Sequence, residues 1–244
     1  MKKNLVYGIH SVQAVLTRDS DQVIELWVDV GRKDKRIQSI MDKAHGLKLH
    51  KVSRDDLDVL AGGGNHQGVI AHVADNKSLR SEDDLPRLIQ EKGDDTFLLI
   101  LDGIQDPHNL GACLRSADGA GVDAVIVPRN GTVSLTAVVH KVACGAAETI
   151  PFIQVTNLAR TLRMLKDEGV WLVGADGDAK TSLYEIDLTG PLAMILGGEG
   201  KGLRRLTREQ CDYQAYIPMA GTVESLNVSV ATGICLFEAV RQRC

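Results

Sequence analysis

Unbroken runs of apolar residues restrict the fold of this 244-residue chain more than any other feature of its sequence. The run at 97–101 reads Phe-Leu-Leu-Ile-Leu, and shorter apolar runs lie at 125–127 and 192–196. A strand with one face in water alternates apolar and polar residues, whereas a strand of a parallel sheet is covered on both faces and is apolar throughout. Helical patterns separate the runs, over 112–121, 136–147 and 156–168. The pattern predicts an α/β domain with a parallel sheet and helices on both of its faces.

A second, smaller α/β unit is predicted for residues 1–75. It opens with a short strand, a turn at Gly8 and a helix within 4–16, and further strands are predicted over 23–30, 47–52 and 69–73. The polar and acidic stretch 76–94 is predicted to be a linker that carries one short helix near 85–91. The α/β domain then occupies 95–244.

The formal net charge of −4 excludes nucleic-acid binding by bulk positive charge alone, but the charge is unevenly spread. Residues 1–75 hold 11 Lys and Arg against 10 Asp and Glu, and the remainder holds 17 against 22. One basic cluster lies in the first unit and consists of Arg32, Lys33, Lys35 and Arg36. Such a cluster is more often the solvated start of a helix, and it becomes a candidate RNA contact if the rest of the chain acts on RNA.

Five cysteines are scattered along the chain, and none forms a C-x-x-C pair. Their odd number and spacing favour reduced thiols in a cytoplasmic protein and make a metal site improbable. No apolar run is long enough to cross a membrane, and no charged and apolar leader opens the sequence. We expect a cytoplasmic protein that uses no metal.

The first of three polar loops follows the apolar run at 97–101. Pro107 stiffens it, Asn109 is a plausible helix cap, and Gly111 admits a close backbone. Arg115 lies further along the helix among small and apolar residues. We expect this arginine to be buried beside a partner, because an unpaired buried charge is costly, and this favours a functional role.

The second loop follows the run at 192–196 and contains four glycines from Gly197 to Gly202, together with Glu199 and Lys201. It is not a P-loop, because Gly202 follows Lys201 where Ser or Thr is required. It is not a dinucleotide loop either, because Leu203 occupies the place of the third glycine. Its glycines still predict a close approach to the backbone.

The third loop precedes the last helix. A strand closed by Pro218 is followed by a turn at Gly221 and by Ser225, which is predicted to cap a helix that continues to Val240. The helix is apolar on two sides, which predicts that it is buried. Burial of the helix does not explain the hydrogen-bonding side chains of Glu224, Ser225 and Asn227 at its start, and we interpret this end as a site.

Together the three loops resemble motifs one, two and three of the SpoU family of SPOUT RNA methyltransferases. Asn109 and Arg115 match motif one, Glu199 matches motif two, and the Ser-Leu-Asn at 225–227 matches motif three. The Tyr-Gly-Ile-His at 7–10 and the His-Gln-Gly at 66–68 extend the resemblance over nearly the whole chain. It is most similar to family members that methylate guanosine in the peptidyl-transferase P loop of 23S rRNA.

The resemblance implies a fold, a cofactor and partners. The C-terminal sheet would carry a SPOUT-type trefoil knot, and the first unit would be a ribosomal-protein-like RNA-binding domain. S-adenosylmethionine would lie in the knot against the backbone at Gly197, Ile217 and Leu226, and the enzyme would be a homodimer without metal. The reaction would be methylation of a ribose 2′-hydroxyl of 23S rRNA, or of another rRNA or tRNA site.

The resemblance also assigns catalytic positions, namely Arg115, Asn109, Glu199, Ser225 and Asn227. The family assigns the base to Arg115, although a guanidinium stays protonated in proteins. Two roles remain open for it: a base with a strongly depressed pKa, or a cation that holds a phosphate and stabilises the alkoxide. A binding-only RNA protein and a nucleotide-dependent oxidoreductase are the rival functions, and the basic residues that follow motif two are an alternative RNA contact (Lys201, Arg204, Arg205 and Arg208).

Overall fold

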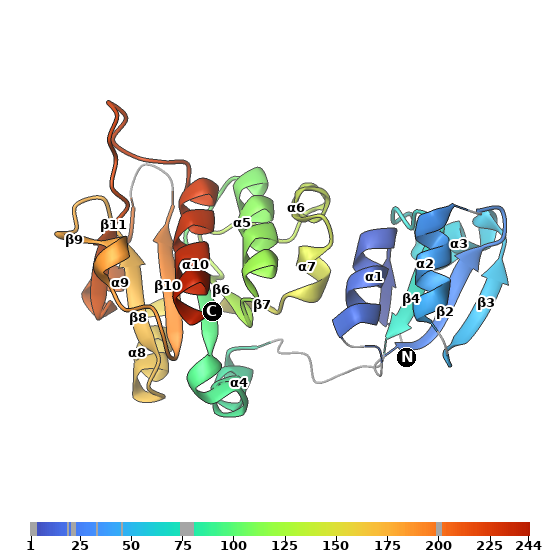
Figure 1. Ribbon diagram of the computed structural model, residues 1–244, viewed down its shortest axis with the longest axis horizontal. Coiled ribbons are helices and arrows are strands. Elements are labelled where there is room, and N and C mark those ends of the chain that lie inside the picture. Colours follow the sequence, from blue (N-terminus) through green and yellow to red (C-terminus); the bar gives the residue numbers. More distant parts are fainter. Residues whose placement is uncertain are drawn as a thin grey trace. The chain divides into compact units, whose positions relative to one another are not determined.

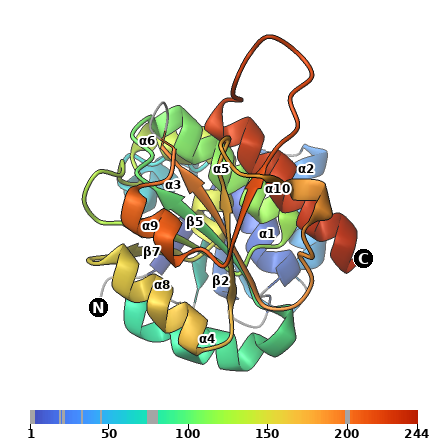
Figure 2. The same ribbon diagram turned by 90° about the vertical axis from the view of Figure 1, so that its left-hand side faces the viewer.

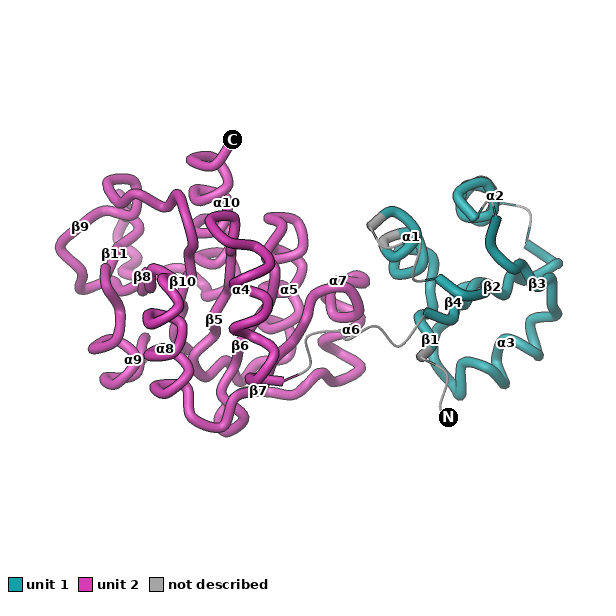
Figure 3. The backbone as a smooth tube through the Cα atoms, turned by 90° about the horizontal axis from the view of Figure 1, so that it is seen from below, with its two compact units in different colours: residues 1–78 teal, residues 79–244 magenta. Residues whose placement is uncertain are grey.

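The computed structural model describes residues 4–18, 20, 23–32, 34–44, 46–73, 81–198 and 202–244. It contains two compact units, Met1–Ser78 and Leu79–Cys244, which Figure 3 distinguishes by colour. Each unit has a hydrophobic core of its own, so each is described separately.

The first unit is a four-stranded sheet in the order β1-β4-β2-β3, in which only the β2–β3 pair is parallel. The strands are β1 (Asn4–Tyr7), β2 (Val23–Asp29), β3 (Lys48–Val52) and β4 (Val69–Val73). Helices α1 (Ile9–Arg18) and α2 (Lys35–Lys43) contribute to the larger core with Leu26 and Val28. Helix α3 (Arg54–Ala61) packs on the other face over Trp27 and Ile70, which explains why β2 is buried on both sides from Leu26 onward.

The second unit is built on a seven-stranded sheet in the order β7-β6-β5-β10-β8-β11-β9, and every neighbouring pair is parallel. The strands are β5 (Phe97–Asp102), β6 (Ala124–Pro128), β7 (Phe152–Val155), β8 (Trp171–Ala175), β9 (Thr181–Ser182), β10 (Leu192–Gly197) and β11 (Tyr213–Tyr216). The chain runs outward from β5 to β7 and then continues on the other side of β5. The direction of winding therefore reverses between β5 and β10.

Helices cover both faces of this sheet, as Figures 1 and 2 show. Leu99 and Leu101 face one core, to which α5 (Pro107–Ala120), α6 (Ala137–Ala143), α7 (Ala146–Thr149) and α10 (Val228–Arg243) contribute. Leu98 and Ile100 face the opposite core, with α4 (Leu85–Lys92), α8 (Leu158–Asp167) and residues next to α9 (Arg205–Gln210). The predicted α/β class with a parallel sheet covered on both faces is confirmed. The threading that would make its C-terminal part a trefoil knot stays a prediction.

Two boundaries differ from the sequence prediction. Helix α5 begins at Pro107 rather than at 112, because the Asp106 side chain accepts a hydrogen bond from the backbone N–H of His108 and Pro107 suits the first helical position. Asn109 is therefore inside the helix and is not its cap. The helix predicted over 136–147 is broken at Cys144, whose φ of 53° lies in the left-handed region.

The predicted linker over 76–94 is too long. Leu85, Leu88 and Ile89 of α4 are at most 5% exposed and pack in a core of the second unit. The short 3-10 turn Glu82–Asp84 is tied to α8, because Glu82 accepts a hydrogen bond of 2.8 Å from the Thr161 hydroxyl. The part of the linker from Ser81 onward thus belongs to the folded second unit.

The last helix also departs from expectation. Its cap is Asn227 and not Ser225, because the Asn227 side chain accepts the backbone N–H of Ser229 at 2.8 Å. Cys235, Leu236 and Ala239 are fully buried, whereas Val230 and Phe237 are 51% and 50% exposed. The prediction that both apolar sides are buried is wrong, because α10 lies on the outside of the sheet and only one side meets α5 and the core.

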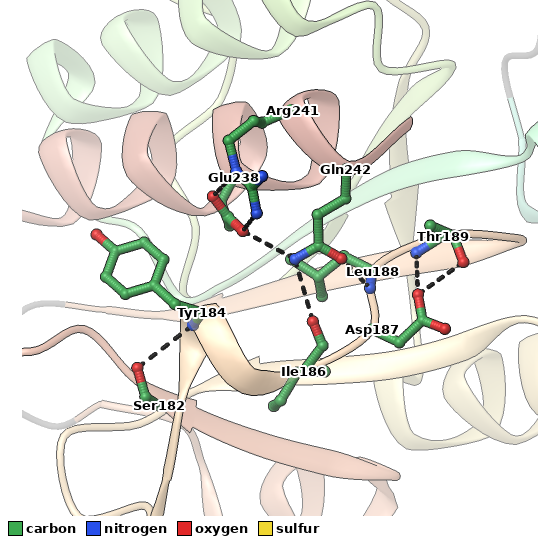
Figure 4. Close-up of polar contacts among 9 residues, drawn as sticks. All are labelled: Ser182, Tyr184, Ile186, Asp187, Leu188, Thr189, Glu238, Arg241 and Gln242. Carbon is green, nitrogen blue, oxygen red and sulfur yellow. Dashed lines mark hydrogen bonds and ion pairs between the residues drawn. The ribbon is translucent and has the colours of Figure 1, made fainter. Parts of the chain in front are cut away.

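The C-terminal turn of α10 is fastened to the segment before β10 (Figure 4). The Gln242 amide donates hydrogen bonds to the Ile186 carbonyl at 3.1 Å and to Glu238 at 2.8 Å, and its oxygen accepts the Leu188 N–H at 2.9 Å. The Arg243 guanidinium donates to the Leu188 carbonyl at 3.1 Å. These contacts hold the end of the chain against the sheet.

Candidate active site

The first two motif loops begin side by side. Asp102 and Gly197 are paired residues at the carboxyl ends of β5 and β10. This is where the winding direction of the sheet reverses, the usual ligand position in open parallel sheets. The Gly198 N–H also donates to the Asp102 carbonyl at 3.0 Å, which holds the second loop against the first.

The first and third motifs meet through two asparagines. The Asn227 side-chain N–H donates a hydrogen bond of 3.0 Å to Asn109 Oδ1, although the residues are 118 positions apart. Asn109 is 7% exposed in the first turns of α5, and Asn227 is exposed at the start of α10. Helices α5 and α10 pack against each other, and Cys113 Sγ lies 3.3 Å from the Thr232 hydroxyl further along the pair. This helix packing keeps the two motifs in register.

Arg115 is exposed, so the expectation that it is buried is wrong. It projects from α5 six residues after Asn109, a rise of about 9 Å along the helix. Its guanidinium donates to Cys144 Sγ at 3.7 Å, a contact that the break between α6 and α7 makes possible.

The other predicted residues lie on the two remaining loops. Ser225 is exposed and Leu226 is half-buried in the connection between β11 and α10, which stands away from the sheet in Figure 2. Ile217 is half-buried against the core, and Gly197 ends β10. Glu199 lies outside the described residues.

Gly197 is required by packing. A Cβ added to it would lie 2.0 Å from the carbonyl carbon of Gly202, and one added to Gly198 would lie 2.6 Å from the Gly103 carbonyl oxygen. Contacts this short force the backbone to shift. A larger residue at 197 would therefore disturb the loop itself, besides any effect on a bound cofactor.

Two residues of this edge were not named from the sequence, Asp102 and Thr207, and they lie beside Arg204 of the basic set after motif two. The Asp102 side chain is fully buried and accepts a hydrogen bond of 2.7 Å from the Thr207 hydroxyl. An acidic residue directly after an unbroken apolar strand was the available signal, because a carboxylate at that place is rarely left without partners.

In the first unit, the turn 66–68 contacts one residue of the basic cluster, Arg32. Gln67 accepts the Ile9 N–H at 3.1 Å and receives the Arg32 guanidinium on its carbonyl at 2.5 Å. Arg32 is also paired with Asp34 at 2.6 Å, so it is largely used within the fold. Lys35 and Arg36 are exposed, whereas Lys33 lies outside the described residues.

Two kinds of feature are absent from the described chain. Within 4–18, 20, 23–32, 34–44, 46–73, 81–198 and 202–244, no three His, Cys, Asp or Glu side chains are grouped so as to hold a metal ion. The same residues include no helix with the length and apolar character that crossing a membrane requires.

Comparison with protein families identifies both units. Residues 96–237 match the family model described as the SpoU rRNA Methylase family. The chain belongs to the SpoU rRNA methylase family. Residues 5–79 match a second model, described as RNA 2'-O ribose methyltransferase substrate binding. The family resemblance inferred from the three motifs is confirmed.

Several known proteins are similar to this chain over nearly its whole length. It is 57% identical over 244 residues to the 23S rRNA (guanosine-2'-O-)-methyltransferase RlmB of Shewanella oneidensis, covering 99% of this chain and 98% of that protein. A crystal structure of an RNA 2'-O ribose methyltransferase is 30% identical with a TM-score of 0.68, covering 99% of this chain and 89% of that one. An AdoMet-bound rRNA methyltransferase from Sinorhizobium meliloti is 25% identical with a TM-score of 0.67, covering 98% and 87%.

Proposed function

We propose that this protein transfers a methyl group from S-adenosylmethionine to the ribose 2′-hydroxyl of a guanosine in 23S rRNA, in the peptidyl-transferase P loop. The observation that carries the proposal is the hydrogen bond between Asn109 and Asn227. It unites two motifs of an RNA methyltransferase family at the ligand-binding edge of a parallel sheet. A protein acting on ribosomal RNA is expected in the cytoplasm.

The residues at this edge fit the cofactor. Within the described chain, residues 218–226 make no backbone hydrogen bonds with one another or with other segments. Exposed backbone donors and acceptors of this kind are suited to an adenine edge. Gly197, Ile217 and Leu226 would hold the cofactor, which supplies an electrophilic methyl group when bound.

Catalysis then rests mainly on positioning. The attacking ribose oxygen must approach in line with the bond that breaks, and it must lose its proton. Asn109 and Asn227 are fixed to each other and would orient the ribose, with Ser225 on the same loop and Glu199 from the second motif. Arg115 would either accept the proton as a base or, as a cation, stabilise the alkoxide and a nearby phosphate.

We also propose that the enzyme is a homodimer through α5 and α10. Val230 and Phe237 are half-exposed on α10, and Gly119 lies beside Phe237 on α5. An apolar stripe next to small residues fits a close contact between helices of two copies. Phe237→Asp should give a monomer in light scattering, whereas Val59→Asp, at a residue 82% exposed in the first unit, should not change the mass.

The proposed division of the chain assigns RNA binding to the first domain (1–75), through Lys35 and Arg36, and catalysis to the second, which begins at Ser81 as a folded unit. Incubation with labelled S-adenosylmethionine and 23S rRNA, followed by mapping of 2′-O-methyl groups, tests the function. One methylated guanosine in the peptidyl-transferase P loop is the expected result. Label transfer to tRNA alone, or binding without transfer, would overturn it.

A further inference from the structure

A buried carboxylate lies where the first and second motif loops begin. Asp102 is the last residue of β5, and its side chain is 0% exposed. Oδ2 accepts hydrogen bonds from the Thr207 hydroxyl at 2.7 Å and from the Arg204 backbone N–H at 3.3 Å. Oδ1 accepts no hydrogen bond from the residues that the structure describes, and it faces Arg204 Nε at 3.5 Å. Because a buried carboxylate requires a counter-charge, Asp102 fixes both the backbone and the guanidinium of Arg204.

The Arg204 guanidinium lies where three loops meet. Gly103 follows β5, Gly131 follows β6, and Arg204 follows β10, and these three strands are neighbours in the sheet. A Cβ added to Gly103 would lie 3.2 Å from Arg204 Nη2, and a Cβ added to Gly131 would lie 2.7 Å from it. Both loops therefore leave room for the guanidinium at the carboxyl edge of the sheet because they carry no side chain there.

The Nη side of this guanidinium is available to a ligand. The Arg204 side chain is 53% exposed, and its Nη atoms donate no hydrogen bond to any residue of the described chain. The two nearby arginines already have carboxylate partners. Arg205 is paired with Glu209 at 2.6 Å, and Arg208 is paired with Asp176 at 2.7 Å. An arginine held at Nε with an open Nη edge matches the two oxygens of a phosphate.

We propose that Arg204 binds a phosphate of the RNA backbone beside the methylated nucleotide, and that Asp102 positions it. This inference rests on the proposed function, because it names the RNA contact at the same site. It selects one residue of the basic set after motif two and assigns it to the substrate rather than to the cofactor. Arg205, with a carboxylate of its own helix as partner, has no such role.

The test compares Arg204→Gln, Arg204→Lys and the matched control Arg205→Gln. With 23S rRNA, Arg204→Gln should raise KM for RNA about tenfold and lower the slope of log affinity against log salt by roughly one unit. S-adenosylmethionine affinity, measured by calorimetry, should stay within about twofold of the wild type. Arg205→Gln should change none of these values.

Arg204→Lys separates a loss of RNA binding from a loss of folding. A lysine keeps the positive charge that Asp102 requires, but it lacks the planar guanidinium edge that would bind two phosphate oxygens. The variant should be as stable as the wild type and still show a raised KM. Asp102→Asn should likewise raise KM for RNA more than it lowers kcat. Unchanged RNA affinity and salt slope in Arg204→Gln, with the wild type still methylating rRNA, would overturn this inference alone. A wild type that neither binds nor methylates the RNA would overturn both proposals.

Discussion

The side chain of Asn227 serves two elements at once. Its oxygen accepts the Ser229 backbone N–H at 2.8 Å and the Ser229 hydroxyl at 2.6 Å, and its N–H donates to Asn109 Oδ1 at 3.0 Å. The cap contacts fix which side of the amide faces Asn109. The start of α10 and the connection between the motifs therefore depend on the same group.

Asn227→Asp separates these two roles. Aspartate is as good a helix cap as asparagine, but it has no N–H for Asn109 and places a carboxylate oxygen against Asn109 Oδ1. We expect a melting temperature within a few degrees of the wild type and a loss of at least about tenfold in single-turnover methyl transfer, since misplaced groups lose rate steeply. Ser229→Ala removes only one cap contact and serves as the control. Full activity of Asn227→Asp would show that the asparagine pair is not part of the catalytic arrangement.

Arg115→Ala should abolish transfer without unfolding the protein. The side chain is exposed, so its removal leaves no buried cavity, and substitutions at such positions change the free energy of unfolding by about 0.5 kcal/mol or less. Single-turnover assays with bound RNA measure the loss. Asn109→Ala should abolish transfer as well, because it removes the partner of Asn227.

Arg115→Lys distinguishes the two roles proposed for this arginine. A lysine keeps the positive charge, so partial activity with an unchanged pH profile would support the cationic role. If residue 115 acts as the base, its side chain must first lose a proton, and an ordinary lysine does so only as the pH approaches its pKa of about 10.4. Activity that rises steeply toward that pH would support the base. Near wild-type chemistry in Arg115→Ala would exclude both.

Gly197→Ala should destabilise the second motif loop and weaken cofactor binding together. The added Cβ overlaps the Gly202 backbone, and overpacking of this kind costs about 1–3 kcal/mol. Calorimetry with S-adenosylmethionine and thermal unfolding give the two values. Gly177→Ala is the matched control, because nothing lies within 4 Å of its added Cβ. Wild-type cofactor affinity in a folded Gly197→Ala protein would place the cofactor elsewhere.

A truncated protein that begins at Ser81 should fold and bind the cofactor but lose most of its RNA affinity. A start near Asp94 would remove α4 and expose the core that Leu85 and Leu88 cover, so it would not test RNA binding cleanly. Within the full chain, Lys35→Ala with Arg36→Ala should lower the salt slope by roughly one unit for each RNA phosphate that is no longer neutralised. Correct methylation at full affinity by the truncated protein would refute RNA binding by the first unit.

Glu238 should make stability depend on pH in acid. Hydrogen bonds from Arg241, which has the larger effect, and from Gln242 lower the pKa of this carboxyl from 4.5 to about 2 (Figure 4). A pKa lowered by folding contributes stability that is present above pH 4.5 and is lost as the pH falls to about 2. Glu238→Gln should therefore lower the free energy of unfolding by about 1–2 kcal/mol at pH 7, with a difference that shrinks below pH 4.5. A difference that stays constant between pH 7 and 3 would contradict this.

Local patterns predicted much of the fold. The apolar runs at 97–101 and 192–196 indicated strands buried on both faces, and they form the buried strands β5 and β10. These features depend on neighbours within a few residues, which a sequence shows directly. The motif residues could likewise be named from the sequence, because their identity and spacing along the chain carry the family resemblance.

Only the tertiary structure decided which of these residues meet. The Asp102–Thr207 bond spans 105 positions because β10 lies beside β5 in the sheet, and the Asn109–Asn227 bond spans 118 positions because α10 packs against α5. The same order of elements left Arg115 and Phe237 exposed, where local apolar surroundings had predicted burial. Hydrophobic periodicity reports that a residue lies on an apolar face, but what covers that face depends on strand order, which periodicity does not contain.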